Sequence, residues 1–540
     1  MKSIRTFCLL VLASGMALGQ ASPPNNSNVA DDLKTLREAI AAQQKQIADQ
    51  QKKLEDLQQQ LDAKSAATPH VQNATLTTTA PATNVSMVQS DVEKPKESPL
   101  SVRIGGTEFT PGGFVDFTNI FRTTNTGSAV STGFNAIPFS NTAPGQITEF
   151  RSSGQYSRFN LKVTGKYGEN KLNGYIEADF NGNDAANVFV TTNPHTFRLR
   201  LFYLQLQRHS WEFTAGQAWG LLTPNKVGVG ASPSDLDTTM ATDGNIMVGV
   251  MYSRDAQFRL AWKPSDRFGW AVAVANPQQT TAGEVVLPSG GAPANLISTT
   301  LGPQVDGSAA AGVPNLMPDI TTKIAFDTNP TGRNLHVEAG AIVTSVQLSV
   351  PRPGVVGAFD KKSDIGGGIL GGLGYSVTKK FRVLAHGMYG PGVGRYFIGF
   401  GPQFVVVPIA VSPTTFTATP SPVHAGAGFG GVEWQAATKT QIGAYYGGFY
   451  FQRNAFADIT VPTLPIIGFG GIGSGLNNNR SIQEGEFVLA QTLWKNPQYG
   501  ALVLTSDNSY TTRAPWFHLA TQPKNAHMFM SRLDLKYVIP

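Results

Sequence analysis

The chain has 540 residues and a formal net charge of +6, but only 14% of its residues are charged. Soluble domains average about 25% charged residues, so this composition argues against a row of ordinary soluble domains. No apolar run beyond the first residues approaches the roughly 20 residues of a membrane helix, and no polybasic cluster favours nucleic-acid binding. Abundant glycine and 10% aromatic residues are instead typical of a lipid-facing β-barrel.

Residues 1–19 have the pattern of a secretory signal: a basic start, the apolar stretch FCLLVLASGMALG and a small-residue cleavage site. The apolar stretch is too short for the alternative, a membrane anchor. Removal of this signal would also remove Cys8, the single cysteine of the chain. We therefore expect a mature protein without disulfides, thiolate metal ligands or a cysteine nucleophile.

Apolar residues at spacings of three and four predict a coiled coil over residues 29–64. The a positions are Leu33, Ile40, Ile47, Leu54 and Leu61, and the d positions are Leu36, Gln43, Gln50, Leu57 and Lys64. Glutamine layers lower the stability of such a seam but can specify its register. We expect this segment to self-associate, because a solitary amphipathic helix, the alternative, would leave its apolar stripe uncovered.

Residues 65–100 are rich in Thr, Ala, Pro and Ser, lack periodicity and are predicted to form a flexible linker. Beyond them, over residues 101–540, short and long connections alternate. The short ones are 166–170, 209–210, 264–267, 329–332, 378–379, 438–439 and 496–500, and the long ones include 123–154, 277–318, 398–423 and 454–479. Tight periplasmic turns and long external loops are the pattern of outer-membrane barrels, which predicts that both ends of this region lie on the periplasmic side.

The segments between these connections alternate apolar and polar residues. In RFNLKVTG, residues 158–165, Phe159, Leu161 and Val163 share one face and the polar residues share the other. A water-soluble sandwich would alternate as well, but the length, the loop asymmetry and the preceding signal favour a membrane barrel. We therefore predict an all-β transmembrane barrel of about 16 antiparallel strands, preceded by the α-helical coiled coil.

The sequence contains no zinc-binding His pair, nucleophile elbow or phosphate-binding loop. Its eight histidines show no metal-ligand spacing. A barrel-embedded lipase with a Ser/His pair near the lipid face is an enzymatic alternative that spacing alone leaves open. We expect no catalytic residue, no metal and no cofactor.

Basic residues alternate with apolar neighbours on several predicted strands, which places them on the lumen side. The candidates for pore lining and anion binding are Arg158, Lys162, Arg198, Arg200, Arg259, Arg382 and Arg532. In FRLRLFYLQLQR, the same rule directs Leu199, Leu201 and Tyr203 to the lipid side. Guanidinium groups in a water-filled pore attract anions. The alternative is that the lumen charges only pair with local acids and stiffen the wall, the candidate acids being Glu177, Asp179 and Asp534.

The third long connection, residues 220–251, carries Asp235, Asp237 and Asp243. In 16-stranded diffusion channels this loop commonly folds inward and narrows the pore. We expect a constriction in which these acids face the arginines across a gap. An ordinary external loop is the alternative.

The stretches SRFNLKVTG, GYIEADF, FRLRLFYLQLQ and EFTAGQAWGLLTP, in that order, resemble the opening strands of bacterial porins. With the heptads, they are similar to the DcaP-like family, over about residues 29–64 and 101–265. The resemblance implies a homotrimeric channel in the outer membrane of a diderm bacterium, with a periplasmic coiled coil and diffusion of small anionic solutes such as dicarboxylates. The expected partners are outer-membrane lipid, further copies of the chain and those solutes. The alternative from another class is a structural or adhesive anchor with no open pore.

Overall fold

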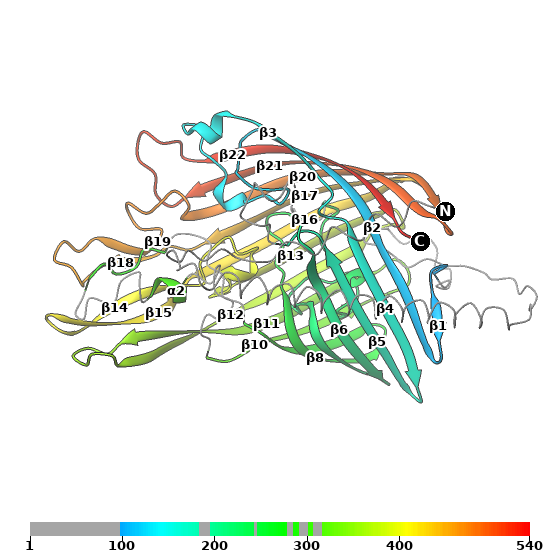
Figure 1. Ribbon diagram of the computed structural model, residues 1–540, viewed down its shortest axis with the longest axis horizontal. Helices are drawn as coiled ribbons and strands as arrows, with labels where there is room; N and C mark the ends of the chain where they lie inside the picture. The colour runs from blue at the N-terminus through cyan, green and yellow to red at the C-terminus, as the bar shows by residue number, and fades with distance from the viewer. Residues whose placement is uncertain (1–97, 183–194, 242–245, 278–284, 291–300, 306–315) are drawn as a thin grey trace, which may run out of the picture. The chain divides into compact units, whose positions relative to one another are not determined.

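The computed structural model describes residues 98–182, 195–241, 246–277, 285–290, 301–305 and 316–540 (Figure 1). The predicted signal, the predicted coiled coil and nearly all of the predicted linker lie outside the described residues. All described residues belong to one compact unit, Thr77–Pro540.

In the described ranges, sixteen strands form a closed antiparallel barrel, which confirms the predicted number. They are β2 (Thr107–Arg122), β4 (Arg158–Tyr167), β5 (Asn170–Asp179), β6 (Arg198–Arg208), β7 (Trp211–Trp219), β8 (Arg254–Ser265), β9 (Phe268–Ala275), β10 (Asp319–Asp327), β11 (Leu335–Pro351), β12 (Phe359–Ser376), β13 (Phe381–Pro391), β16 (His424–Ala437), β17 (Thr440–Phe451), β20 (Asn479–Asn496), β21 (Gly500–Pro515) and β22 (Ala526–Val538). The barrel closes at β2, whose first half pairs with β4 and whose second half pairs with β22.

The remaining described elements are short and decorate the barrel. Strands β1 (Val102–Ile104) and β3 (Glu149–Ser153) pair with β2, while β14 (Phe404–Ser412) with β15 (Thr415–Pro422) and β18 (Asn454–Ala457) with β19 (Ile466–Phe469) form separate hairpins. The helical pieces are η1 (Phe134–Ala136), η2 (Ala143–Gln146), η3 (Pro233–Asp235), α2 (Gly302–Val305) and η4 (Gly394–Tyr396). Within the described ranges, no helix has the length and apolar character needed to cross a membrane.

Burial along the strands is the inverse of that in a soluble sandwich. In β10, DITTKIAFD, every second side chain is buried, and the buried set contains two aspartates and Lys323. The exposed set contains Ile320, Ile324 and Phe326. A water-soluble protein would turn the isoleucines inward and the lysine outward, so this alternation favours a wall with a polar interior and a lipid-facing exterior.

The connections have the predicted asymmetry. Strands β6 and β7, for example, are joined by residues 209–210, and β16 and β17 by residues 438–439. At the other end, β9 and β10 are separated by residues 276–318, and the connections that contain β14–β15 and β18–β19 are also long. Figure 1 shows these hairpins at the end of the barrel opposite the C-terminus. In outer-membrane barrels the long connections lie at the external end.

The barrel interior is packed rather than empty along part of its wall. Long connections contribute buried aromatic and methionine side chains that pack on the inward face of β13, β17, β20 and β22. Phe397, for example, stacks on Phe449 of β17 with ring centroids 5.5 Å apart. Members of this cluster include Phe134, Phe139, Met247, Val250, Met388, Phe429, Phe451, Ile482 and Met528.

The predicted facing of β6 is wrong beyond Arg200. Leu201 and Tyr203 are 0% and 7% exposed, whereas Phe202 is 43% exposed. A β-bulge explains the change: Glu177 of β5 pairs with Leu201 and the next residue, Ala178, pairs with Leu199, so Arg200 is an extra residue. The insertion reverses the alternation after it, which the strict period of two cannot anticipate.

Candidate functional site

The connection between β7 and β8, residues 220–253, lies inside the barrel and contacts its far wall. Its atoms bond to inward side chains of β8, β10, β11, β13, β17 and β20. Many of its described residues are buried, including the apolar run Met247–Met251. Residues 242–245 lie outside the described ranges. We call residues 220–253 the lumen segment.

The first part of the lumen segment folds back on itself before it reaches the wall. Asn225 and Leu236 form an antiparallel bridge, and the Asp237 amide donates to the Pro224 carbonyl at 2.8 Å. The short helix η3 makes the turn between them, with a proline in its first position, where no backbone donor is needed. This closed turn presents Asp237 to β13.

Asp237 is completely buried and is held by two cations of β13. Arg382 Nη1 donates to its Oδ1 at 2.8 Å, and Arg382 Nη2 donates to its Oδ2. His386 Nε2 lies 2.9 Å from the same Oδ2. Burial opposes ionisation of Asp237, but the charges of Arg382 and His386 outweigh it and hold the pKa of this carboxyl well below its ordinary value.

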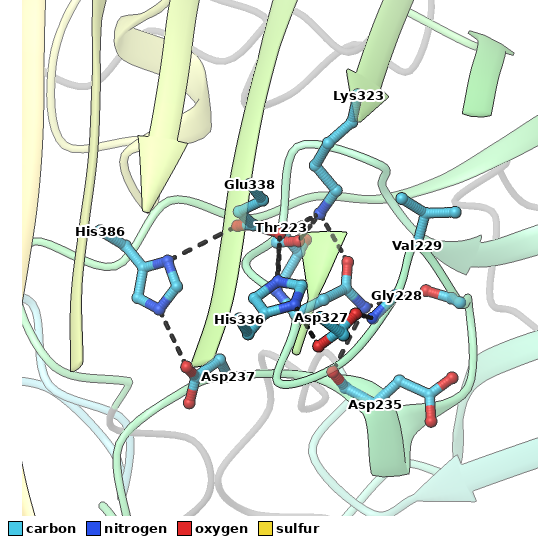
Figure 2. Close-up of polar contacts among 12 residues, drawn as sticks. Thr223, Gly228, Val229, Asp235, Asp237, Lys323, Asp327, His336, Glu338 and His386 are labelled. Carbon is cyan, nitrogen blue, oxygen red and sulfur yellow. Dashed lines mark hydrogen bonds and ion pairs between the residues drawn. The ribbon is translucent and has the colours of Figure 1, made fainter. Parts of the chain in front are cut away.

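Glu338 of β11 is the second charged centre (Figure 2). Lys323 Nζ lies 2.9 Å from its Oε2, and the same oxygen accepts the Asn225 amide at 3.2 Å. His336 Nε2 is 3.4 Å from Oε2, while His386 Nδ1 is 3.5 Å from Oε1. The 3.5 Å contact is an ion-pair distance rather than a hydrogen bond. Glu338 thus joins the wall of the barrel to the backbone of the lumen segment.

Lys323 and Asp327 of β10 also hold backbone groups of the lumen segment. Lys323 donates to the Thr223 carbonyl at 2.9 Å, and Asp327 accepts the Gly228 amide at 2.8 Å. Asp327 also contacts His336 Nδ1 at 3.0 Å, so that this imidazole lies between Asp327 and Glu338. Charged side chains thereby satisfy backbone polar groups that the turn leaves unpaired.

Two glycines of β12 make room for this network. A Cβ at Gly372 would lie 2.0 Å from His386 Nδ1, and one at Gly374 would lie 2.4 Å from Arg382 Nη2. Real Cβ atoms do not approach other atoms so closely, so any larger residue would displace these side chains. The GGLG stretch of β12 is therefore fitted to the imidazole and guanidinium groups above it.

Residues 246–253, the second described part of the lumen segment, are held by one carboxylate and by close packing. Glu484 of β20 accepts the Val248 amide at 2.8 Å. Gly249 has a φ of +105° and lies against the backbone of Gly428 and Gly447, where a Cβ would be 2.3 Å from the Gly428 carbonyl oxygen. Only glycine fits this close approach. Around it, Met247, Val248, Val250 and Met251 join the apolar cluster of the far wall.

The predicted basic residues on β4 and β6 form a cluster with local acids. Arg198 and Arg200 each donate to Asp179, at 2.6 Å and 2.7 Å, and Arg200 also donates to Glu177 at 2.8 Å. Arg158 lies 3.5 Å from Glu177. Three guanidinium groups therefore share two carboxylates, which leaves positive charge in excess on this side of the lumen.

The other predicted arginines lie elsewhere and are also engaged. Arg532 contacts Glu486 at 3.0 Å and Asp507. Arg259 donates to the Gly230 carbonyl of the lumen segment at 3.2 Å. Arg382, as described, holds Asp237, so this acid contacts its arginine directly rather than facing it across a gap.

Lys162 and Arg254 differ from most of these arginines in their lack of an acidic partner in the described ranges. Lys162 is exposed on the inward face of β4, where it pairs with Tyr175 of β5. The guanidinium of Arg254 lies 5.3 Å from the ring centroid of Trp219. In the part of the chain that the structure describes, neither cation has a carboxylate within ion-pair distance.

Arg254 borders a cavity of about 330 Å³ that lies between the segment containing η4 and the ends of β6, β7 and β8 nearest the long connections. Polar residues dominate its lining and include Arg198, Gln217, Tyr252, Asp255 and Arg395. Arg395 is ion-paired with Asp319 of β10. Three guanidinium groups and the Asp255 carboxylate thus line one cavity. No group of three or more His, Cys, Asp or Glu in the described ranges is placed to hold a metal.

No protein-family model and no curated protein matches this chain. Among solved structures, the outer membrane channel DcaP of Acinetobacter baumannii is 15% identical with a TM-score of 0.52, and the match covers 81% of this chain and 99% of that one. The chain has the fold of this outer-membrane channel. The resemblance to DcaP-like porins proposed from sequence is confirmed at the level of fold.

Two further solved structures give lower scores. The anion-selective porin from Comamonas acidovorans is 10% identical with a TM-score of 0.42, covering 80% of this chain and 100% of that one. OmpT of Vibrio cholerae is 8% identical with a TM-score of 0.41, covering 81% and 99%.

The three predicted acids of the lumen segment have different places. Asp237 is at the centre of the charged contacts, and Asp243 lies outside the described residues. The Asp235 carboxylate points away from the two histidines in Figure 2, and burial raises its pKa. The DcaP-like resemblance alone did not distinguish among them.

Several wall residues that hold the lumen segment, or contact a residue that does, are not among the candidates drawn from the sequence: Lys323, Asp327, His336, Glu338 and Glu484. The alternation rule could have found them. In LHVEAG, His336 and Glu338 alternate with Leu335 and Val337, which marks them as inward residues. The partners that the lumen segment brings to them are not visible in that pattern.

Proposed function

We propose that this protein is an outer-membrane porin that lets small hydrophilic solutes diffuse passively and that favours anionic organic acids such as dicarboxylates. The closed barrel and its inward polar face support a channel in the outer membrane rather than an enzyme. The lumen segment supports a constriction, because it occupies part of the interior. In such a channel, selectivity follows from pore width and from the charges that solutes pass.

The observation that carries the anion preference is the surplus of cations on the side of the lumen formed by β4, β6 and β8. Arg158, Arg198 and Arg200 share two carboxylates there. Lys162 and Arg254 have no carboxylate within ion-pair distance in the described ranges. Positive charges that no carboxylate cancels attract anions most strongly in a narrow site of reduced dielectric.

The test is the reversal potential across a planar bilayer in a dilute salt gradient. The double variant Lys162→Gln, Arg254→Gln should shift the potential toward cations and lower the flux of a four-carbon dicarboxylate into vesicles. In concentrated salt the shift should shrink, because salt screens the charges. Arg267→Gln is the matched control, since Arg267 is exposed in the turn between β8 and β9. An unchanged potential in the double variant would contradict the anion preference.

The apolar packing of the lumen favours one alternative, a structural or adhesive anchor without an open pore. Phe397, Phe449 and Phe451 are fully buried beside the inner wall, and much of the interior near β13–β22 is filled. Such a protein would not conduct at all. Ion conductance of the purified wild type therefore decides between the two functions.

We also propose that residues 29–64 form a periplasmic coiled coil that holds three copies together, with residues 1–19 as a removed signal and residues 65–100 as the linker to the barrel. The heptad pattern supports this organisation. Sedimentation of the full chain and of a chain lacking 29–64 in the same detergent tests it. The deletion should lower the stability of the trimer, and identical behaviour would contradict a role in assembly.

A further inference from the structure

Asp237 connects the lumen segment to Arg382 and His386 of β13. We propose that Asp237 is the positioning residue of the lumen segment, and that the imidazolium of His386 makes this position depend on pH. The part of the proposal that concerns conductance depends on the proposed channel function; the part that concerns the position of the segment does not.

The geometry indicates a charged His386. Its Nε2 faces Asp237 at 2.9 Å and its Nδ1 faces Glu338 at 3.5 Å. A neutral imidazole has one nitrogen without hydrogen, and that nitrogen would direct a lone pair at a carboxylate. An imidazolium presents N–H to both. Its ring also stacks on Phe429 of β16, with centroids 5.3 Å apart, which restricts it to this orientation.

The charges of the groups in direct contact also balance when both imidazoles are charged. The cations are Lys323 of β10, His336 of β11, and Arg382 and His386 of β13; the carboxylates are Asp237 of the lumen segment, Asp327 of β10, Glu338 of β11 and Glu433 of β16. Strand β12 contributes only glycine at the contact. With both histidines protonated, four cations match four carboxylates in a buried site, where an unmatched charge is costly.

A rise in pH removes a proton from the imidazolium. Either Asp237 or Glu338 then faces an unprotonated nitrogen, and the network gains a net negative charge. Arg382 still holds Asp237, so the segment loosens without being expelled. Histidine is the side chain whose charge ordinarily changes near neutral pH, which makes His386 the element that responds.

The first test is single-channel conductance as a function of pH, from about pH 5 to 10, across the range in which histidine can titrate. We expect the wild type to show an upward step in conductance as pH rises. His386→Gln should remove the step and leave conductance at its high-pH value, because glutamine keeps a donor but carries no charge. Asp237→Asn should do the same, since the amide no longer attracts the imidazolium.

His336→Gln is the matched control. His336 also lies between two carboxylates, and in the described ranges both of these polar partners belong to strands of the wall rather than to the lumen segment. A His336→Gln channel should keep the step. A step that persists in His386→Gln, or one that disappears only in His336→Gln, would overturn the proposal.

A second measurement does not need conduction. Ala231 of the lumen segment is 1% exposed, so a cysteine in place of this residue reports release of the segment through the rate of thiol labelling. Labelling rates are compared among the Ala231→Cys, Ala231→Cys/His386→Gln and Ala231→Cys/Asp237→Asn variants at a single pH. The pH dependence of the thiol's own reactivity then does not enter the comparison. At neutral pH the two double variants should label about tenfold faster or more, the size expected for loss of a charge-assisted hydrogen bond.

The two measurements separate the two proposals. Equal labelling in all backgrounds overturns the positioning role of Asp237, whatever the protein conducts. Faster labelling without conductance in any variant keeps the positioning role and removes the channel function. A conducting wild type with a flat pH profile keeps the channel and overturns the pH dependence.

Discussion

The two described parts of the lumen segment are attached to the barrel in opposite ways. Residues 220–241 reach β10, β11 and β13 through buried ion pairs and charge-assisted hydrogen bonds, with Asp237 at their centre. Residues 246–253 reach β16, β17 and β20 through packing of methionine and valine side chains and one close glycine contact. Ion pairs distinguish the first part, although Leu222 and Leu236 also pack in apolar clusters, whereas the second part is held mainly by apolar surface together with the Glu484 contact.

This difference predicts which end of the segment can move. Buried ion pairs depend on complete pairing, and loss of one partner leaves an uncompensated charge. Apolar packing varies little with pH and weakens only when volume is removed. We therefore expect the part near β13 to respond to pH and the part near β20 to remain in place.

The largest expected effect is that of Asp237→Ala. It leaves Arg382 and His386 buried without their shared carboxylate, a loss of about 3–5 kcal/mol. Because the pKa of Asp237 is lowered in the folded protein, the carboxylate's contribution is present above its unfolded pKa and is lost only as pH falls through the lower folded pKa. The difference in urea midpoint from the wild type should therefore persist between about pH 5 and 7 and shrink only in stronger acid. A difference already gone at pH 5 would contradict the pairing.

The apolar part of the segment should respond to loss of volume. Met247 is completely buried in the cluster of the far wall, so Met247→Ala should cost about 2–5 kcal/mol. Urea midpoints at several pH values measure it. Unlike the Asp237 variant, this one should lose the same amount at every pH, and a pH-dependent loss would break the comparison.

Gly372→Ala tests the fit of the charged part without removing any charge. The added Cβ would lie 2.0 Å from His386 Nδ1, so the ring must leave its contacts, at a cost of about 1–3 kcal/mol. The pH-dependent step in conductance should disappear as well. Gly371→Ala is the control, because its Cβ would meet nothing closer than the Glu338 carbonyl at 3.4 Å. Equal behaviour of the two variants would mean that His386 does not need this space.

The smallest expected effect is that of Glu484→Gln. Glutamine keeps an oxygen that can accept the Val248 amide, now 2.8 Å from Glu484, and loses only the charge. A change of about 1 kcal/mol or less in unfolding free energy follows. A loss as large as that of Met247→Ala would show that charge, rather than packing, holds this part too.

The sequence predicted the barrel better than the contents of its lumen. The alternation in DITTKIAFD marks Lys323 as inward without any knowledge of its partners. The same rule failed after Arg200, where a bulge places Leu201 inside. The acids of the third long connection marked Asp237 as a candidate, but not its contact with Arg382, because 145 residues separate the two.

By itself, the sequence determined the strand period, the order of short and long connections and the inward side of most strands. These are local properties, because side-chain facing repeats every two residues and turn chemistry acts over a few. Only the tertiary structure decided that residues 220–241 and 246–253 lie in the lumen, that Arg158 and Arg200 share acids with their neighbours, and that His386 lies between Asp237 and Glu338. Those contacts depend on the closure of the barrel and on the path of one long connection inside it. No periodicity in the chain encodes either.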